Sequence, residues 1–273
     1  MSTQRGGGAR RLAATDLREM KQRGDRIAAI TAYDYLFARL VDAAGVVVVL
    51  VGDSLGQVVL GLDSTLPVTL DDMIYHARAV RRGVERALLV VDLPFLTYQV
   101  SREDALRNAG RVMQETGASA VKLEGGSPET AETVRALVRA GIPVVGHLGF
   151  TPRSVNLTGA RVQARGEDAA ARLLEDALRL EEAGALAIVL ELVPGTVAQR
   201  VSEALTIPTI GIGAGAACDG QVLVLHDMLG LNPGFSPRFL RVFADVGQVA
   251  GDGVREYVRT VKSGEFPAAE NTF

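Results

Sequence analysis

The chain has 273 residues, a length at which one closed α/β barrel and two smaller domains are both common. Its 29 Lys and Arg residues against 32 Asp and Glu residues give a formal net charge of −3, with both signs scattered, which argues against a nucleic-acid partner. With 48% apolar and 5% aromatic residues and no Trp, the composition excludes a disordered chain and argues against base stacking. The single cysteine, Cys218, excludes an intrachain disulfide and a zinc site built on cysteine pairs.

The beginning of the chain carries glycine and positive charge but lacks the apolar core of a secretory signal. We expect a flexible tail over residues 1–10, followed by a single barrel domain over residues 11–273. The longest apolar stretch, from Ala43 to Gly52, is far shorter than the roughly 20 residues that span a bilayer. Together with the lone cysteine, this predicts a cytoplasmic protein with no membrane partner.

Short runs rich in β-branched residues alternate with segments of helical periodicity. We predict strands at 27–33, 46–51, 87–91, 120–123, 143–146, 187–190, 209–212 and 221–225. Several runs are apolar at consecutive positions, which is typical of parallel strands buried on both faces. The alternation predicts a (β/α)8 TIM barrel, with a doubly wound open sheet as the alternative. The segment GAGAACDG between the last two runs is too short for a crossover helix, so either that helix is absent or one predicted strand is wrong.

The expected helices have recognisable ends. N-terminal capping signals occur at Thr69 with Asp72, Ser101 with Asp104, and Ser127 with Pro128, and a further helix is expected to start at Thr196. Glycines that stop a helix follow three of the apolar stripes, at Gly117, Gly141 and Gly184. The helix before Gly184 is predicted over 167–183.

Ionisable residues lie at the ends of five consecutive predicted strands. In a barrel the carboxyl ends of the strands converge on the active site. The residues at these ends are Asp53 with Ser54, Asp92, Lys122 with Glu124, His147, and Glu191. Any one of them can be a turn former or a helix cap, but their occurrence on five strands in succession indicates a functional site.

Two of these strands carry charge inside an apolar run. Lys122 and Glu124 are two residues apart, so both side chains point to the same face, which we expect to be the barrel interior. Buried charge is costly unless it is paired or bound to an ion. Glu191 stands between Leu190 and Leu192 and is a candidate for proton transfer.

Asp53, Asp92 and Glu124 form a donor set made only of oxygen atoms. Such a set selects a hard divalent cation, with Mg²⁺ favoured over zinc, held by one or two direct carboxylates while water and substrate complete the octahedron. The alternative is a metal-free network in which Lys122 and nearby arginines neutralise the carboxylates.

Three other residues are weaker candidates. His76 lies within a predicted helix, where a packing or surface role is expected. His226, at the end of the last predicted strand, is expected to make a structural hydrogen bond. Cys218 lies in the glycine-rich segment GIGAGAACDG without a positioned partner, which argues against a nucleophile. That segment resembles phosphate-binding turns, a pattern that gives many false positives.

The motifs at the strand ends resemble those of the ketopantoate hydroxymethyltransferase family. The resemblance extends from about residue 27 to the end of the chain and is carried by ITAYDYLFARL, VGDSLG, DSTLPVTLDDMIYHARAVRRG, DLPF, VKLEGG, GHLGFTPRSVN, LELVP and IGIGAG with DGQVLVLHDMLG. It implies that Asp53, Asp92 and Glu124 surround Mg²⁺. It also implies that Lys122 and Ser54, with Asp53 and Asp92, hold a 2-oxo acid, that Glu191 accepts a proton, and that His147 belongs to the same catalytic pocket.

The resemblance further implies a reaction and an assembly. The reaction is the Mg²⁺-dependent enolisation of 3-methyl-2-oxobutanoate and transfer of a hydroxymethyl group from 5,10-methylenetetrahydrofolate, giving 2-dehydropantoate for pantothenate biosynthesis. The implied assembly is a homodecamer. The sequence departs from the family pattern in NLTGARVQARGED, which is shorter than the usual FGGYKVQGR-like segment, and at Ala216 and Cys218, where Asn and Thr are expected.

Two other functions remain open at this point. One is a Mg²⁺-dependent barrel enzyme of the phosphoenolpyruvate mutase and isocitrate lyase group, whose lyases use a cysteine in a basic loop that Cys218 matches poorly. The other is a non-catalytic barrel that binds a ligand or acts as a scaffold. Mg²⁺-dependent exchange of the substrate's C3 hydrogen distinguishes an enzyme from a binder.

Overall fold

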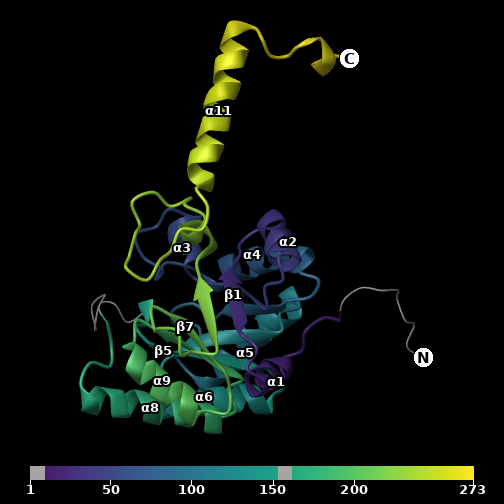
Figure 1. Cartoon of the computed structure of the whole chain (residues 1–273). Helices are drawn as coiled ribbons and strands as arrows, with labels where there is room; N and C mark the ends of the chain where they lie inside the picture. The colour runs from purple at the N-terminus through teal and green to yellow at the C-terminus, as the bar shows by residue number, and fades with distance from the viewer. Residues whose placement is uncertain (1–9, 153–161) are drawn as a thin grey trace. The chain divides into compact units, whose positions relative to one another are not determined.

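A computed structural model describes residues 10–152 and 162–273 (Figure 1). Eight parallel strands close into a barrel in the order of the sequence. They are β1 (Ile27–Thr31), β2 (Val48–Val51), β3 (Leu88–Asp92), β4 (Ala120–Glu124), β5 (Val144–Gly149), β6 (Ala187–Glu191), β7 (Thr209–Ile212) and β8 (Gly220–Leu223). The barrel closes where β1 pairs with β8, so the predicted (β/α)8 fold is confirmed and the open sheet is wrong.

Helices surround the barrel. Those that accompany the strands are α1 (Asp16–Arg23), α2 (Tyr35–Ala43), α3 (Leu55–Val58), α4 (Leu70–Gly83), α5 (Arg102–Thr116), α6 (Pro128–Arg139), α8 (Glu167–Glu182) and α9 (Gly195–Ala204). Neighbouring helices pack against each other from α2 through α4, α5, α6 and α8 to α9. In Figure 1, α5, α6, α8 and α9 cover the outside of the sheet.

The predicted helix caps are present. Thr69 and Asp72 form a reciprocal capping box at the start of α4. Ser101 accepts a hydrogen bond from the Asp104 backbone N–H, and Ser127 caps α6 in the same way, with proline at the first helical position. The helix expected at Thr196 begins one residue earlier, at Gly195.

The connection between β7 and β8 contains turns and no helix in its described residues 213–219. Since β8 pairs with both β7 and β1, the eighth strand is real. Of the two possibilities that the sequence leaves open, the crossover helix is therefore the one that is absent.

The chain divides into two compact units, Met1–Leu223 and Val224–Phe273. All eight strands belong to the first unit. The second unit contains α10 (Leu225–Met228), α11 (Val246–Ser263) and the 3-10 helix η2 (Ala269–Asn271). The single domain over 11–273 stays a prediction, and residues 1–9 of the expected tail lie outside the described residues. Among the helices of the described ranges, none combines the length and apolarity needed to cross a membrane.

The barrel interior is apolar toward the amino ends of its strands. Leu17 of α1 belongs to one hydrophobic core cluster with buried residues of all eight strands. These residues are Ile27, Ala29, Val48, Leu88, Val90, Ala120, Val145, Ala187, Val189, Ile210 and Val222. The polar residues of β3, β4 and β5 lie one layer higher, at the carboxyl ends, so the apolar core supports a polar layer on one side only.

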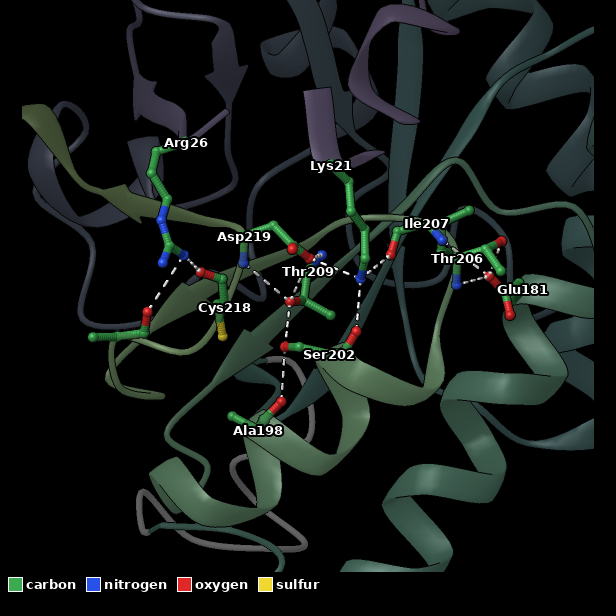
Figure 2. Close-up of polar contacts among 11 residues, drawn as sticks. Lys21, Arg26, Glu181, Ala198, Ser202, Thr206, Ile207, Thr209, Cys218 and Asp219 are labelled. Atoms are coloured by element: carbon green, nitrogen blue, oxygen red, sulfur yellow. Dashed lines mark hydrogen bonds and ion pairs between the residues drawn. The ribbon is translucent and has the colours of Figure 1, made fainter. Parts of the chain in front are cut away.

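A cluster of polar contacts joins α1 to the strands that lack a crossover helix (Figure 2). Lys21 Nζ donates to the carbonyl oxygens of Ser202 (2.7 Å) and Ile207 (3.0 Å), and it pairs with Asp219 Oδ2 at 3.0 Å. The same carboxylate oxygen accepts the backbone N–H of Thr209 at 2.8 Å. The amino ends of β7 and β8 are thereby fixed to α1 by one ammonium group.

We expect Lys21→Met to lower the free energy of unfolding by about 1 to 3 kcal/mol, because it leaves the half-buried Asp219 carboxylate without its cation. Arg23→Met is a matched control on the same helix, since Arg23 makes only exposed ion pairs, and it should change stability by less than about 0.5 kcal/mol. Urea denaturation of both variants measures the difference. Equal effects would contradict the role of Lys21.

Candidate active site

The predicted site residues gather at one end of the barrel. Asp92, Glu124 and Glu191 are the last residues of β3, β4 and β6. His147 lies in β5, and Asp53 and Ser54 follow the end of β2. Because all the strands are parallel, these positions converge at the carboxyl end of the barrel.

A chain of polar contacts crosses four neighbouring strands. Lys122 Nζ lies 2.9 Å from Asp92 Oδ1 and 3.5 Å from His147 Nδ1. His147 Nδ1 also lies 3.5 Å from Glu124 Oε1, and its Nε2 lies 3.2 Å from Glu191 Oε2. The register explains part of this arrangement, since Asp92 pairs with Lys122 and Glu124 with His147 across adjacent strands.

His147 is buried, and its ring nitrogens lie near three charged side chains, those of Lys122, Glu124 and Glu191. Burial and the nearby Lys122 ammonium lower its pKa, whereas hydrogen bonds to Glu124 and Glu191 raise it, and the result is a pKa above the ordinary value. A protonated imidazole donates from both ring nitrogens. His147 therefore lies between the two carboxylates, with Nδ1 toward Glu124 and Nε2 toward Glu191.

Asp53 and Ser54 are placed by contacts with other strands. The backbone N–H of Asp53 donates to Asp92 Oδ2 at 3.2 Å, which brings the ends of β2 and β3 together. Ser54 Oγ lies 2.7 Å from the hydroxyl of Tyr33. A Cβ atom at Gly52 would lie 3.0 Å from Ser54 Oγ and 3.5 Å from Asp92 Oδ2. Glycine at this position therefore leaves room for these two polar side chains.

Tyr33 is a site residue that the sequence reasoning missed. It follows β1 and is buried, and burial together with the charges of Asp92 and Asp53 raises its pKa far above the ordinary value. The phenol therefore stays protonated and can donate a hydrogen bond. His76 Nδ1 lies 2.7 Å from the Tyr33 carbonyl oxygen, so the packing role expected for this histidine is confirmed. The signal was available, because Tyr33 ends the first predicted strand.

The backbone around Glu191 is held in an unusual conformation. Leu192 has a φ of 49°, a left-handed value that non-glycine residues rarely adopt. Phe150 N–H donates to the Glu191 carbonyl oxygen at 2.7 Å. Gly149 has a φ of 95°, and a Cβ there would overlap that carbonyl oxygen and lie 2.7 Å from Val193 Cγ2. The close contact between Gly149, at the end of β5, and Glu191, at the end of β6, therefore restricts the backbone of Glu191.

Two weaker candidates and one unusual segment remain to be placed. Burial raises the pKa of the Cys218 thiol, which keeps it protonated and unreactive at neutral pH. His226 lies in α10 of the second unit. Of the segment that departs from the family pattern, residues 156–161 lie outside the described residues.

The donor chemistry of the site fits a hard dication. The site contains four carboxylates, those of Asp53, Asp92, Glu124 and Glu191, and the first three belong to buried residues. Asp92 pairs with the Lys122 ammonium, and Glu124 and Glu191 lie beside the His147 imidazole. Such an excess of buried negative charge is stabilised by a bound cation. Within residues 10–152 and 162–273, no three acidic, His or Cys side chains are close enough to hold a metal by themselves. Mg²⁺ bound at these carboxylates would need waters and substrate oxygens to complete its ligands.

Comparison with known proteins identifies close relatives. The sequence profile of ketopantoate hydroxymethyltransferase matches residues 11–269. A protein of Syntrophus aciditrophicus named 3-methyl-2-oxobutanoate hydroxymethyltransferase is 54% identical over 100% of both chains. A protein of the same name from Chloroflexus aurantiacus is 56% identical over 96% of this chain and 92% of its own.

More distant solved structures share the fold. Phosphonopyruvate hydrolase, in complex with oxalate and Mg²⁺, superposes with a TM-score of 0.62 at 14% identity, covering 95% of this chain and 93% of that one. For 2,3-dimethylmalate lyase, of the PEP mutase/isocitrate lyase superfamily, the TM-score is 0.59 at 16% identity, with 95% and 91% covered. Identities this low establish a common fold only. The profile match and the end-to-end similarity to the relatives confirm the expected family: the chain belongs to the ketopantoate hydroxymethyltransferases.

Proposed function

We propose that this chain is the hydroxymethyltransferase that converts 3-methyl-2-oxobutanoate and 5,10-methylenetetrahydrofolate into 2-dehydropantoate and tetrahydrofolate. The observation that carries the proposal is the polar layer at the carboxyl ends of β2 to β6, in a chain of this family. The substrate's C3 hydrogen is weakly acidic because it lies next to a ketone. The site must therefore remove this proton and stabilise the enolate that results.

Glu191 is the proton acceptor in this proposal. Its side chain is 17% exposed, whereas those of Asp92 and Glu124 are 3% and 4% exposed, so Glu191 is the one most open to a substrate. The contact of 3.2 Å between His147 Nε2 and Glu191 Oε2, together with the constrained backbone at Leu192, restricts the direction of the carboxylate. A fixed base aimed at one carbon is what selective proton abstraction requires.

The substrate's oxygen atoms are held on the opposite side of this layer. Lys122 supplies positive charge for the 2-oxo acid, and Asp92 anchors its ammonium group at 2.9 Å. Ser54 can donate its hydroxyl hydrogen to a substrate oxygen while the Tyr33 hydroxyl donates to Ser54 Oγ. Asp53, Asp92 and Glu124 would hold Mg²⁺, which when bound supplies Lewis-acid charge for the enolate oxygen and orients the substrate.

The carbon–carbon bond then forms without further help from a protein nucleophile. C3 loses its proton to Glu191, and the enolate carbon attacks the methylene carbon of the folate, breaking one of its two C–N bonds. Water then displaces the second nitrogen and leaves its hydroxyl group on that carbon. The two folate nitrogens take up the proton from C3 and the proton from water, and tetrahydrofolate leaves. We further propose that the enzyme works in the cytoplasm as a homodecamer, with residues 11–273 forming its single catalytic domain.

Product formation tests the function. Incubation with both substrates and Mg²⁺ should yield 2-dehydropantoate, measured by mass spectrometry. Removal of divalent metal with EDTA should slow the reaction by about 100-fold or more, and added Mg²⁺ should restore it, since Lewis-acid stabilisation contributes several kcal/mol. No product from the Mg²⁺-loaded protein would exclude the function and favour a non-catalytic barrel. An EDTA-insensitive rate would exclude the metal and favour the network in which Lys122 neutralises the carboxylates.

A further inference from the structure

β4 extends past the end of β3. The last pair between the two strands is Asp92 with Lys122, so Glu124, the last residue of β4, has no β3 residue beside it. Leu93 N–H donates to the Lys122 carbonyl oxygen at 2.9 Å, directly after the last residue of β3. On the other side, Gly125 N–H donates to the His147 carbonyl oxygen at 3.0 Å, so this amide faces β5. Peptide groups alternate in direction along a strand, and the N–H and C=O of Glu124 therefore face β3. The chain that follows Leu93 turns away into the loop 94–101.

The Tyr98 side chain, from that loop, makes the hydrogen bonds to Glu124 that β3 does not make. The Tyr98 hydroxyl accepts the Glu124 backbone N–H at 3.0 Å and donates to the Glu124 carbonyl oxygen at 3.0 Å. Tyr98 is 5% exposed, so water does not readily replace it. A single phenol thus provides the two hydrogen bonds that a continuation of β3 would have made to Glu124.

Contacts within the loop fix the position of this phenol. Thr97 Oγ1 donates to the Pro94 carbonyl oxygen at 2.6 Å. Asn108 of α5 donates through Nδ2 to the Thr97 carbonyl oxygen at 2.7 Å. Leu96 adopts a left-handed φ of 62°, which reverses the chain just before Tyr98. The loop is therefore tied to α5 on one side and to β4 on the other.

We propose that Tyr98 is a positioning residue for the metal centre, which acts by fixing the backbone of Glu124 and hence the direction of its carboxylate. The proposal rests on the metal role of Glu124 in the proposed function. Groups that orient a metal ligand commonly change metal affinity about 10- to 100-fold when they are removed. Here the orienting group acts on the main chain of the ligand, on the side where β3 no longer pairs with β4, and not on the carboxylate itself.

Binding of Mn²⁺ to the metal-free protein, measured by EPR titration, tests this role without any turnover. Tyr98→Phe keeps the ring and removes only the hydroxyl, and it should weaken Mn²⁺ binding by about 10- to 100-fold. Tyr35→Phe is the matched control, because the exposed Tyr35 hydroxyl contacts only Arg39, at 3.5 Å, among the contacts described. Its Mn²⁺ affinity should equal that of the wild type. Hydrogen exchange of the Glu124 amide should accelerate in Tyr98→Phe alone.

Two further variants separate the possible failures. If Glu124→Gln loses Mn²⁺ affinity but Tyr98→Phe binds as the wild type does, the positioning role is overturned and the proposed function stands. If Glu124→Gln binds normally, or the wild type does not bind, the metal role of Glu124 fails and the positioning role fails with it. Should Tyr98→Phe not fold, Asn108→Ala loosens the same loop at Thr97 and is expected to weaken Mn²⁺ binding several-fold. Unchanged affinity in Asn108→Ala would then overturn the proposal.

Discussion

Glu191→Gln is expected to slow exchange of the C3 hydrogen of 3-methyl-2-oxobutanoate by about 10²- to 10⁴-fold, the usual contribution of a general base. Glutamine has nearly the same shape and can still accept a hydrogen bond from His147 Nε2, but it cannot take the proton. Proton NMR in D2O, with Mg²⁺ and without folate, measures the exchange. Mg²⁺-dependent substrate binding should remain nearly intact.

Glu182→Gln is the matched control, since Glu182 is the exposed last residue of α8. Its exchange rate should equal that of the wild type. If Glu191→Gln exchanged the hydrogen at a normal rate, another group would have to be the base, and the chemical role assigned to Glu191 would be wrong.

Gly149→Ala is the second change for which a large effect is expected. The new Cβ would overlap the Glu191 carbonyl oxygen, and the residue would be forced to keep a φ near 95°. The clash and the backbone strain together should lower the free energy of unfolding by about 2 to 5 kcal/mol. Since relief of the clash must move the backbone of Glu191, exchange of the C3 hydrogen should fall as well.

Gly141→Ala separates these two causes. Gly141 also has a positive φ, of 84°, but nothing lies within 4 Å of an added Cβ. It should show only the strain, about 1 to 2 kcal/mol, with normal exchange activity. Thermal and urea denaturation of both variants give the comparison. If both variants lost the same stability and Gly149→Ala kept its exchange activity, the close contact between Gly149 and the Glu191 carbonyl oxygen would be contradicted.

The barrel was predictable because its signals are local. Consecutive β-branched residues indicate buried parallel strands, and the caps at Thr69, Ser101 and Ser127 lie within one helical turn of the groups they bind. The predicted strand boundaries were less accurate where a strand continues past its apolar run. β5 extends to Gly149, past the predicted end at residue 146, because pairing with β6 outweighs the weak strand preference of glycine.

The location of the site followed from topology, since polar residues at the carboxyl ends of parallel strands must converge. The contacts within it did not follow, because they depend on register and on loops. The pairing of Asp92 with Lys122 needs the register of β3 against β4. Tyr98 lies in a loop whose path back to Glu124 has no local signal. Glu191 stands between two leucines in the sequence, yet its side chain is 17% exposed. The backbone changes direction directly after it, at Leu192.

We propose that acidic side chains from separate strands bind one cation together at the carboxyl end of the barrel. Mn²⁺ can stand in for Mg²⁺ at oxygen ligands. An anomalous difference map of a crystal grown with Mn²⁺ and 3-methyl-2-oxobutanoate locates it directly. We expect one peak, bound directly or through water by Asp53, Asp92 and Glu124, with the substrate's C3 facing Glu191. A peak elsewhere, or a fully occupied substrate with no cation beside these carboxylates, would contradict it.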